Sequence, residues 1–334
     1  MRRIEIASNN RSQSSTDQQS TPIRIGISSC LLGEKVRFNG GHAKDSFLVD
    51  TFGCFVEWVP VCPEVEIGLG TPRETLRLVR MDNGIRLIMP KPGVDHTNSM
   101  RAYAERRVNE LTREDLSGYI LKKDSPTCGM ERVKVCDSNK VPSKSGRGVF
   151  AEVLLEASPL LPVEEEGRLN DPRLRENFVE RIFAYHRLRR LFSKRWTVGD
   201  LVAFHTAHKF QLRAHSEQAY RRMGRLVADA KAVPRDKVRS QYEFEFMSAL
   251  AKMATPKRNT DVLIHISGYF KKVLDAAFKQ ELLGLIDDYR YGLIPLIVPL
   301  TLIRHYIRRF DVGYLQGQVY LDPHPKELML RNHV

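Results

Sequence analysis

Short apolar runs of strand length recur through the first half of the chain. Residues 23–28, 56–61 and 119–121 are the clearest runs, and each of them leads directly into a turn segment. Between the second and the third run, residues 98–111 place apolar side chains three to four positions apart, which predicts a helix. Strands that alternate with helices are typical of an α/β domain with a mainly parallel, Rossmann-like sheet.

Two further runs predict a hairpin beside this sheet. Residues 75–79 and 85–89 alternate apolar and polar positions around Asp82-Asn83-Gly84. An Asn-Gly pair tolerates the positive φ angles of a tight turn, and it therefore indicates two antiparallel strands. A helix start is expected at Asp45, and a further apolar run covers residues 149–155.

The second half of the chain has helical periodicity almost throughout. Apolar residues recur every three to four positions over residues 174–192, behind Asn170-Asp171-Pro172, which places a cap and then a proline in the first turn. Residues 197–200 have the form of a capping box ahead of a helix over 201–222, and residues 260–291 continue the pattern. We therefore predict an all-α helical bundle.

These patterns divide the chain into four segments. Residues 1–22 are predicted to be a disordered tail, because they are polar and lack apolar periodicity. Residues 23–160 form the α/β domain, residues 161–169 a connector, and residues 170–334 the helical domain. A chain of 334 residues with 42% hydrophobic residues has room for two separate cores.

Charge differs between the two halves. Residues 1–167 carry 23 Lys and Arg against 23 Asp and Glu, whereas residues 168–334 carry 30 against 17, so the second half holds the whole net charge of +13. A basic domain beside a neutral one favours a polyanionic partner such as RNA, DNA or an anionic membrane surface. A general solubility bias is the alternative.

Neither a secretion signal nor a membrane span is predicted. The longest apolar run, residues 293–303, contains two prolines and is shorter than the ~20 residues that cross a bilayer. The five cysteines are odd in number and include no close pair, so a disulfide framework is not expected. We predict a cytoplasmic protein whose thiols serve as ligands or nucleophiles.

Three of the cysteines follow the three strand-like runs. Cys30, Cys62 and Cys128 each stand just past a strand end, where parallel sheets form their ligand crevice, so the three thiols are expected to meet. Three thiolates on an iron-sulfur cluster would leave one iron open to another ligand, although scattered cysteines are also typical of ordinary buried thiols. Cys54 has apolar neighbours and is expected to be a core residue, and Cys136 has no assigned role.

The segments around these cysteines match a known family in order. They are Ser29-Cys30-Leu31-Leu32-Gly33, Val61-Cys62-Pro63-Glu64-Val65, Gly70-Thr71-Pro72-Arg73 and the stretch from Leu121-Lys122 to Cys128-Gly129. Over about residues 23–160 the chain resembles the TudS-type thiouracil desulfidases. One departure is Lys35-Val36, where many members carry a further cysteine that is not a cluster ligand.

The helical half is similar to the YbgA-type domain. The similarity lies at residues 208–210, 262–270, 295–300 and 314–318. A fusion of these two domains is the arrangement of the RudS desulfidases, which act on 4-thiouridine in tRNA. The resemblance therefore implies tRNA as the partner.

The resemblance also implies a mechanism. It implies a 4Fe-4S cluster held by Cys30, Cys62 and Cys128, whose open iron takes up the soft sulfur of a thiocarbonyl. Polarisation of the carbon-sulfur bond then lets water replace the sulfur without net redox change. Glu64 is the expected base or proton shuttle, and Ser125 is expected to orient the water or to donate to the substrate. Without the resemblance, Glu64 would be interpreted as a solvated charge or a cap.

Basic residues of the helical half are expected to contact RNA phosphates. They are Lys209, Arg213, Arg221, Arg222, Lys257, Arg258, Lys271 and Lys272. His205 and His208 are interpreted as phosphate contacts or ordinary helix-face residues in preference to a metal site. Two alternative functions stay open: a desulfidase of free thiouracil or thiouridine nucleotides, and a non-catalytic nucleic-acid-binding protein with structural cysteines.

Overall fold

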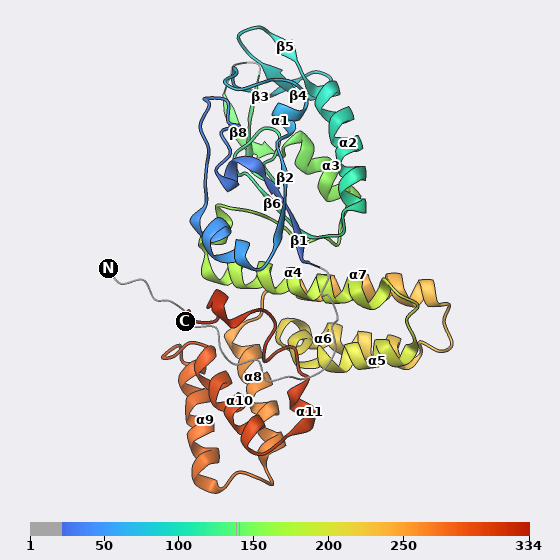
Figure 1. The fold of residues 1–334 in the computed structure, drawn as a ribbon, viewed down its shortest axis with the longest axis vertical. Coiled ribbons are helices and arrows are strands. Elements are labelled where there is room, and N and C mark those ends of the chain that lie inside the picture. The colour runs from blue at the N-terminus through green and yellow to red at the C-terminus, as the bar shows by residue number, and fades with distance from the viewer. Residues whose placement is uncertain (1–21, 138, 140) are drawn as a thin grey trace.

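The computed structural model describes residues 22–137, 139 and 141–334. The predicted tail, residues 1–22, lies outside the described residues apart from Pro22. An α/β half that ends near residue 165 is followed by a helical half, and the long helix α4 (Pro172–Phe192) crosses between them (Figure 1). The predicted fold class is confirmed.

The central sheet of the first half is parallel throughout. Its strands lie in the order β2-β1-β6-β9. Their bounds are β1 Arg24–Ser28, β2 Glu57–Val61, β6 Leu116–Leu121 and β9 Val163–Glu165. All six residues of β6 are buried, as expected for a parallel strand that is covered on both faces.

Two layers cover this sheet. On one face α2 (Thr97–Arg113) and α3 (Val149–Ala157) contribute Val108 and Phe150 to a core with Tyr119. On the other face the short helices η1 (Ser29–Leu32), η2 (Phe47–Thr51) and η3 (Phe52–Cys54) pack together with α4. Both faces are therefore shielded from water, and the ends of the strands are left to form the site.

A second sheet contains the predicted hairpin. Its strands lie in the order β5-β4-β3-β7-β8, and only β3 and β7 pair in parallel. Their bounds are β3 Arg77–Met81, β4 Gly84–Met89, β5 Val94–Asp95, β7 Val133–Cys136 and β8 Pro142–Gly146. Gly84 has a φ of +111°, which confirms the prediction that the Asn-Gly turn needs a positive φ.

The segment predicted as a connector, residues 161–169, differs from the prediction. Residues 163–165 pair with β6 as strand β9, and Glu164, Glu165 and Glu166 are buried. The carboxylate of Glu165 accepts a hydrogen bond from Met130 N at 2.7 Å, and that of Glu166 accepts one from Lys123 N at 2.8 Å. The glutamates thus support the loop after β6.

Helix boundaries follow the local capping signals. Asp171 caps α4 by accepting hydrogen bonds from Arg173 N and Leu174 N, and Thr197 and Asp200 form the predicted capping box. The helix predicted over residues 98–111 is α2, which begins one residue earlier, at Thr97. The helix predicted over 201–222 is divided. The remaining helices are α5 Val198–Ala207, α6 Lys209–Ala228, α7 Arg235–Leu250, α8 Pro256–Ser267, α9 Ala276–Arg290, α10 Ile297–Arg309 and α11 Gly313–Gln316.

The two halves share one apolar cluster. Ile182 of α4 lies so close to β6 that a Cβ on Gly118 would stand 2.8 Å from its Cγ1. Leu328 and Leu330, from the segment after α11, join Ile27 of β1 in the same cluster. Side chains of α4 and of the segment after α11 therefore complete the core of the α/β half. Among the described residues, no helix combines the length and the apolar character that crossing a membrane requires.

Candidate active site

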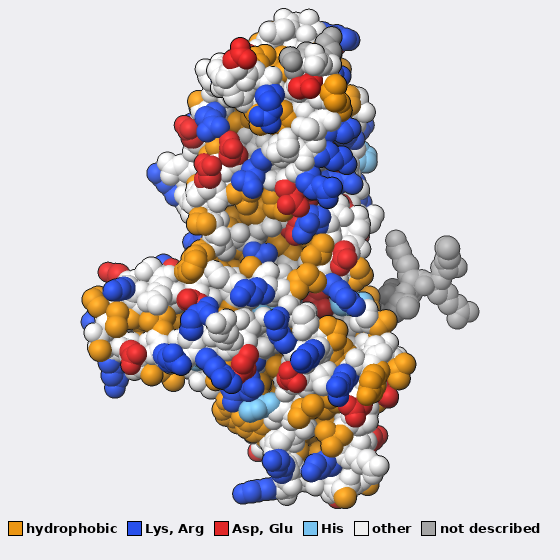
Figure 2. All heavy atoms as spheres, turned by 180° about the vertical axis from the view of Figure 1, so that it is seen from behind, with side chains coloured by type: hydrophobic (Ala, Val, Ile, Leu, Met, Phe, Trp, Pro, Cys, Tyr) orange, Lys and Arg blue, Asp and Glu red, His pale blue; other side chains and the backbone are white. Residues whose placement is uncertain are grey.

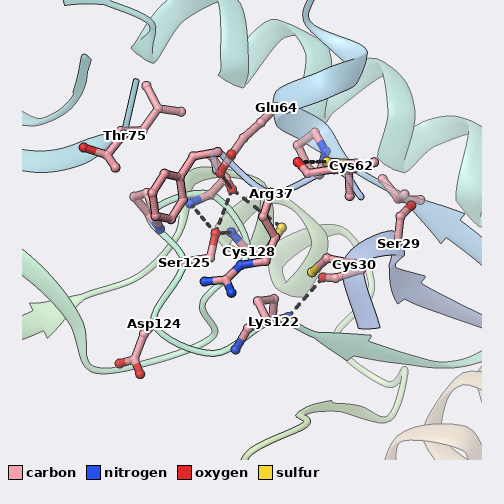
Figure 3. A pocket seen from close by; sticks show the side chains of 18 of the residues that line it. Ser29, Cys30, Arg37, Cys62, Glu64, Thr75, Lys122, Asp124, Ser125 and Cys128 are labelled. Carbon is pink, nitrogen blue, oxygen red and sulfur yellow. Dashed lines mark hydrogen bonds between the residues drawn. The ribbon is translucent and has the colours of Figure 1, made fainter. Parts of the chain in front are cut away.

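Three thiols meet at the carboxyl edge of the parallel sheet. Cys30 follows β1 within η1, Cys62 follows β2 directly, and Cys128 lies in the loop after β6. All three line one pocket of about 370 Å³, in which their side chains surround the same space (Figure 3). Neighbouring parallel strands end at the same edge of a sheet, which brings together cysteines that are far apart in the sequence.

Local backbone contacts fix the loop that carries Cys128. Ser125 Oγ accepts hydrogen bonds from Cys128 N at 3.1 Å and from Thr127 N at 3.3 Å. The carbonyl of Thr127 accepts from Phe150 N at 2.9 Å, at the start of α3. A Cβ on Gly148 would stand 2.5 Å from that carbonyl, so the close approach of α3 requires glycine there.

Glu64 points into the pocket from α1 (Pro63–Glu66). Its Oε2 accepts hydrogen bonds from the guanidinium of Arg73, through Nε at 3.0 Å and through Nη2, and its Oε1 accepts from Thr127 Oγ1 at 2.8 Å. The side chain of Arg73 is only 4% exposed, and it also donates to Val36 O at 2.9 Å. A buried, charge-assisted pair of this kind holds the carboxylate in one place.

A chain of hydroxyl groups continues from Glu64. Thr127 Oγ1 lies 2.9 Å from Ser125 Oγ and 3.6 Å from Cys128 Sγ. Ser125 and Glu64, both predicted as site residues, are therefore linked through Thr127. The places of Thr127 and Arg73 in the site were not predicted from the sequence. Arg73 stood within a matching motif, but its sequence pattern does not show that it reaches Glu64.

Burial disfavours the charged form of all three thiols. It raises the pKa of Cys30 to about 11, and it raises the pKa of Cys62 and Cys128 as well. Lys122 and Arg37, which also line the pocket, act against this rise at Cys30. The neighbouring thiolates would raise one another's pKa, so three thiolates need a positive centre between them.

The other two cysteines lie outside the pocket lining. Cys54 is exposed at the end of η3, so its prediction as a core residue is wrong. Its apolar neighbours pack inward while its own side chain faces solvent, with Sγ 3.7 Å from Asp50 O. Cys136 ends β7 and is half-buried.

The spacing of the thiols bears on what they can hold. Among residues 22–137, 139 and 141–334, no group of three His, Cys, Asp or Glu side chains is as tight as a single metal ion requires. A cluster of several irons bridged by sulfide is wider than one ion, so it suits thiols that line a pocket without converging on a point.

Comparison with known proteins identifies both halves. The family profile described as 2-thiouracil desulfurase matches residues 25–166, and the profile of a protein family of unknown function, DUF1722, matches residues 209–325. The uncharacterized protein YbgA of Escherichia coli is 36% identical over 165 residues, which cover 49% of this chain and 98% of YbgA. The uncharacterized protein YbbK of Bacillus subtilis is 32% identical over 157 residues, which cover 44% of this chain and 98% of YbbK. The N-terminal part of the chain is therefore a 2-thiouracil desulfurase domain, and the C-terminal part is a DUF1722 domain homologous to YbgA. The suspected fusion is confirmed.

One solved structure is also similar to this chain. It is a [4Fe-4S]-dependent thiouracil desulfidase, TudS, 27% identical to this chain, with a TM-score of 0.37. The match covers 45% of this chain and 94% of the TudS chain. The segment of this chain that matches the 2-thiouracil desulfurase profile contains Cys30, Cys62, Glu64, Ser125 and Cys128.

Most of the basic residues expected to bind RNA already have partners within the chain. Five of the eight do: Lys209 donates to Tyr269 and Tyr314, Arg213 and Arg221 pair with Glu217, Arg222 pairs with Glu245, and Arg258 donates to His215 O. The other three, Lys257, Lys271 and Lys272, are exposed and have no side-chain partner among the described residues.

His205 and His208 are core residues of the helical half, so their interpretation as phosphate contacts is wrong. His205 is buried, bonds to Tyr242 Oη at 3.2 Å and stacks on Tyr220. His208 is 2% exposed, and its Nδ1 bonds to Phe204 O at 2.7 Å. Burial lowers the pKa of His205 to about 4 and that of His208 to about 3, so both are neutral near pH 7.

Proposed function

We propose that this chain is a desulfidase that removes the sulfur of 4-thiouridine in tRNA and leaves uridine and sulfide. The observation that carries the proposal is the single pocket that joins three thiols to a carboxylate held by Arg73 and Thr127. Family membership supports the reaction class, and the charge of the helical half supports a polyanionic substrate.

We propose that Cys30, Cys62 and Cys128 hold a 4Fe-4S cluster. The donor set fits, because thiolates are the usual ligands of such clusters and their burial calls for a positive centre. Three ligands leave one iron open, and when bound, the cluster would supply a soft Lewis acid for sulfur. Cys54 and Cys136 lie outside this pocket and are not assigned as ligands.

Glu64 is proposed to take a proton from the water that replaces the sulfur. Arg73 fixes Oε2, so the carboxylate cannot turn away from the pocket. Thr127 and Ser125 extend the hydrogen-bond chain from Oε1, along which a proton can pass. The net reaction exchanges the carbon-sulfur double bond for a carbon-oxygen double bond with water as the oxygen source. The sulfur leaves as sulfide, and no electron is transferred.

The helical half is proposed to bind the tRNA. Figure 2 shows Lys and Arg side chains over this half of the molecule, with fewer Asp and Glu side chains among them. Lys257, Lys271 and Lys272 have the exposure that phosphate contacts need, whereas the other five predicted residues would first have to leave their partners. A cytoplasmic location, predicted from cysteine usage, suits a tRNA substrate.

Anaerobic purification followed by two substrate assays tests the proposal. The protein should contain iron and sulfide, and it should remove the near-ultraviolet absorbance of 4-thiouridine from tRNA faster than from the free nucleoside. Faster turnover of the free nucleoside or of thiouracil would favour the alternative desulfidase. An iron-free protein that binds tRNA without removing sulfur would favour the non-catalytic alternative.

A further inference from the structure

The helical half contains a second hollow that the proposed reaction does not use. It has a volume of about 700 Å³ and lies between α10 and the segment that follows α11. Thr301, Arg304 and Arg308 line it from α10, and Asp322 and Lys326 line it from the later segment. This later segment also carries Leu328 and Leu330, which pack against the α/β half, so the hollow lies at the junction of the two halves.

Positive charge exceeds negative charge in this hollow, which is lined by Arg304, Arg308, Lys326 and Arg331 and by the carboxylates of Asp322 and Glu327. Arg304 and Arg308 are one helical turn apart, and Arg308 and Lys326 are exposed with no side-chain hydrogen bond or ion pair to any described residue. Burial lowers the pKa of Arg304, the charge of Asp322 raises it, and the charges of Arg331 and Arg308 lower it. The three guanidinium groups line the same hollow. An anion between them would relieve this repulsion.

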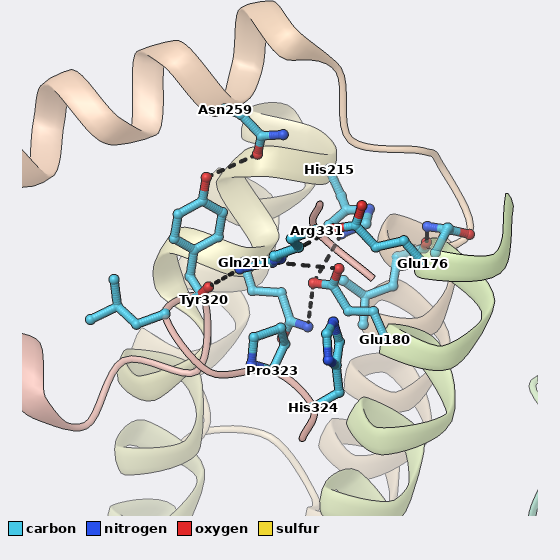
Figure 4. A network of polar contacts seen from close by, with 12 residues as sticks. Glu176, Glu180, Gln211, His215, Asn259, Tyr320, Pro323, His324 and Arg331 are labelled. Atoms are coloured by element: carbon cyan, nitrogen blue, oxygen red, sulfur yellow. Dashed lines mark hydrogen bonds and ion pairs between the residues drawn. The ribbon is translucent and has the colours of Figure 1, made fainter. Parts of the chain in front are cut away.

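A buried network fixes the floor of the hollow. Arg331, which also lines it, is 5% exposed. Its Nε donates to Glu176 at 3.1 Å, its Nη1 donates to Tyr320 O at 2.6 Å, and its Nη2 lies 3.8 Å from Glu180 (Figure 4). The carboxylates of Glu176 and Glu180 neutralise the charge of Arg331. The cations that remain available to a ligand are therefore those of α10 and Lys326.

Groups of the protein hold the guanidinium of Arg304 in place before any ligand binds. Its Nη2 donates to Leu321 O and lies 3.1 Å from Asp322 Oδ1. The side chain of Asp322 is 69% exposed, so an incoming anion can displace its carboxylate into water. An anchored guanidinium loses little side-chain freedom when it binds, and arginine is the preferred side chain for phosphate oxygens.

We propose that Arg304, Arg308 and Lys326 form a binding site for a phosphate group at the junction of the two halves. The tRNA backbone as the source of that phosphate rests on the proposed function, and a small phosphate compound is the other source of the same chemistry. A backbone contact beside the segment that packs against the α/β half would set the register of the RNA relative to the thiol pocket.

The first test measures binding of an unmodified tRNA transcript to the full chain. The double variant Arg308→Ala/Lys326→Ala should bind about tenfold more weakly, and its log-log salt slope should be shallower by about 1.4 to 1.8, at 0.7 to 0.9 per contact. Arg225→Ala/Lys231→Ala is the matched control, since both residues are exposed and lie outside the hollow. Equal losses in the two pairs would overturn the assignment.

A second variant is expected to strengthen tRNA binding instead of weakening it. Asp322→Asn frees Arg304 from its ion pair, so tRNA should bind about threefold more tightly. Asp261→Asn removes an exposed carboxylate outside the hollow and should have a smaller effect. If Asp322→Asn binds no more tightly than Asp261→Asn, Arg304 does not contact the ligand. Thermal unfolding checks that each variant is folded, and Arg308→Gln/Lys326→Gln replaces the alanine pair if needed.

A second test distinguishes the tRNA backbone from small phosphate compounds as the source of the phosphate. Calorimetric titration with inorganic phosphate and with uridine 5′-monophosphate should show weak binding that the alanine pair abolishes if the site serves small phosphates. Loss of tRNA binding alone supports the backbone as the source, and loss in neither arm overturns the site. Removal of sulfur from free 4-thiouridine by the same variant should be unchanged, which separates failure of this site from failure of the proposed function.

Discussion

The side chains of the thiol pocket are held by other side chains, whereas the exposed cations of the helical half end in solvent. Glu64 is bonded to Arg73 and Thr127, but Lys257 and Lys271 have no partner among the described residues. Side chains held in one geometry suit catalysis, because a reaction requires its groups in fixed positions. Exposed cations without partners suit contacts with the phosphates of a polyanion. The comparison indicates that substitutions in the pocket should change turnover, and substitutions on the basic surface should change binding.

Loss of a thiol is expected to have the largest effect. Cys128→Ala should lower iron and sulfide content and abolish desulfuration, because each proposed ligand is needed to hold the cluster. Iron analysis and the visible spectrum of anaerobic protein provide the measurement. Cys54→Ala is the control, since that thiol is exposed outside the pocket. Full iron occupancy in Cys128→Ala protein would refute the ligand assignment.

Glu64→Gln separates ligation from proton transfer. The amide has the shape of the carboxylate, so the iron content should stay, while kcat should fall by roughly 100- to 10,000-fold, as expected for a positioned general base. Unchanged turnover would show that another group activates the water. Single-turnover assays on free 4-thiouridine keep tRNA binding out of the measurement.

The basic surface is tested by salt. Three phosphate contacts through Lys257, Lys271 and Lys272 should contribute about −2 to −3 to the log-log slope of tRNA affinity, at about −0.7 to −0.9 per contact, while desulfuration of the free nucleoside should depend far less on salt. Lys257→Ala, Lys271→Ala and Lys272→Ala should each reduce the slope by a little under one. A slope near zero in the unsubstituted chain would refute RNA binding through phosphates.

Truncation after Glu166 is a poor substitute for these variants. It would remove α4, whose Phe178 and Ile182 pack in the apolar cluster with Ile25 and Ile27 of β1. The shortened domain should therefore be less stable than the full chain, and weaker tRNA binding would not report on charge alone. Thermal unfolding of the truncated and full chains should show a clear loss of stability in the former.

Acid should weaken the helical half through its buried histidines. The ordinary pKa of about 6.5 applies to His208 in the unfolded chain, and burial lowers it to about 3 in the folded state. Below pH ~6.5 the unfolded state binds the proton first, so the free energy of unfolding should fall by up to ~1.4 kcal/mol per pH unit until about pH 3. Denaturant titrations at pH 7 and 5 measure this fall, which His208→Gln should reduce. The exposed His305→Gln should leave it unchanged.

The smallest effect is expected at Ser125. Its hydroxyl orients the loop and extends the hydrogen-bond chain, so Ser125→Ala should lower kcat by about tenfold, below the ~100-fold expected for a base. A loss as large as that of Glu64→Gln would indicate that Ser125 takes part directly in proton transfer.

Local signals explain what the sequence predicts correctly. The cap at Asp171, the capping box at Thr197 and the turn before Gly84 depend on a few adjacent residues, which the sequence displays directly. The meeting of Cys30 and Cys128 in one pocket follows from a general property of parallel sheets, so it needs only the strand positions.

Long-range contacts explain what the sequence does not predict. Strand β9 consists largely of glutamate, a poor strand former, and it exists because β6 and the loop after it supply its partners. The contact between Arg73 and Glu64 depends on how the loop that carries Arg73 approaches α1. The exposure of Cys54 depends on which face η3 presents, and the burial of His208 depends on how α5 and α6 meet, and neighbouring residue types decide neither.

The apolar cluster that joins the two halves also constrains biosynthesis. Ile27 and Leu328 belong to the same cluster although they lie about 300 residues apart in the chain. At translation rates of ~5 to 20 residues per second, the ribosome needs roughly 15 to 60 s to make the intervening segment. During that interval one face of the nascent sheet lacks part of its cover, and it is a site where chaperones are expected to bind before the chain is finished.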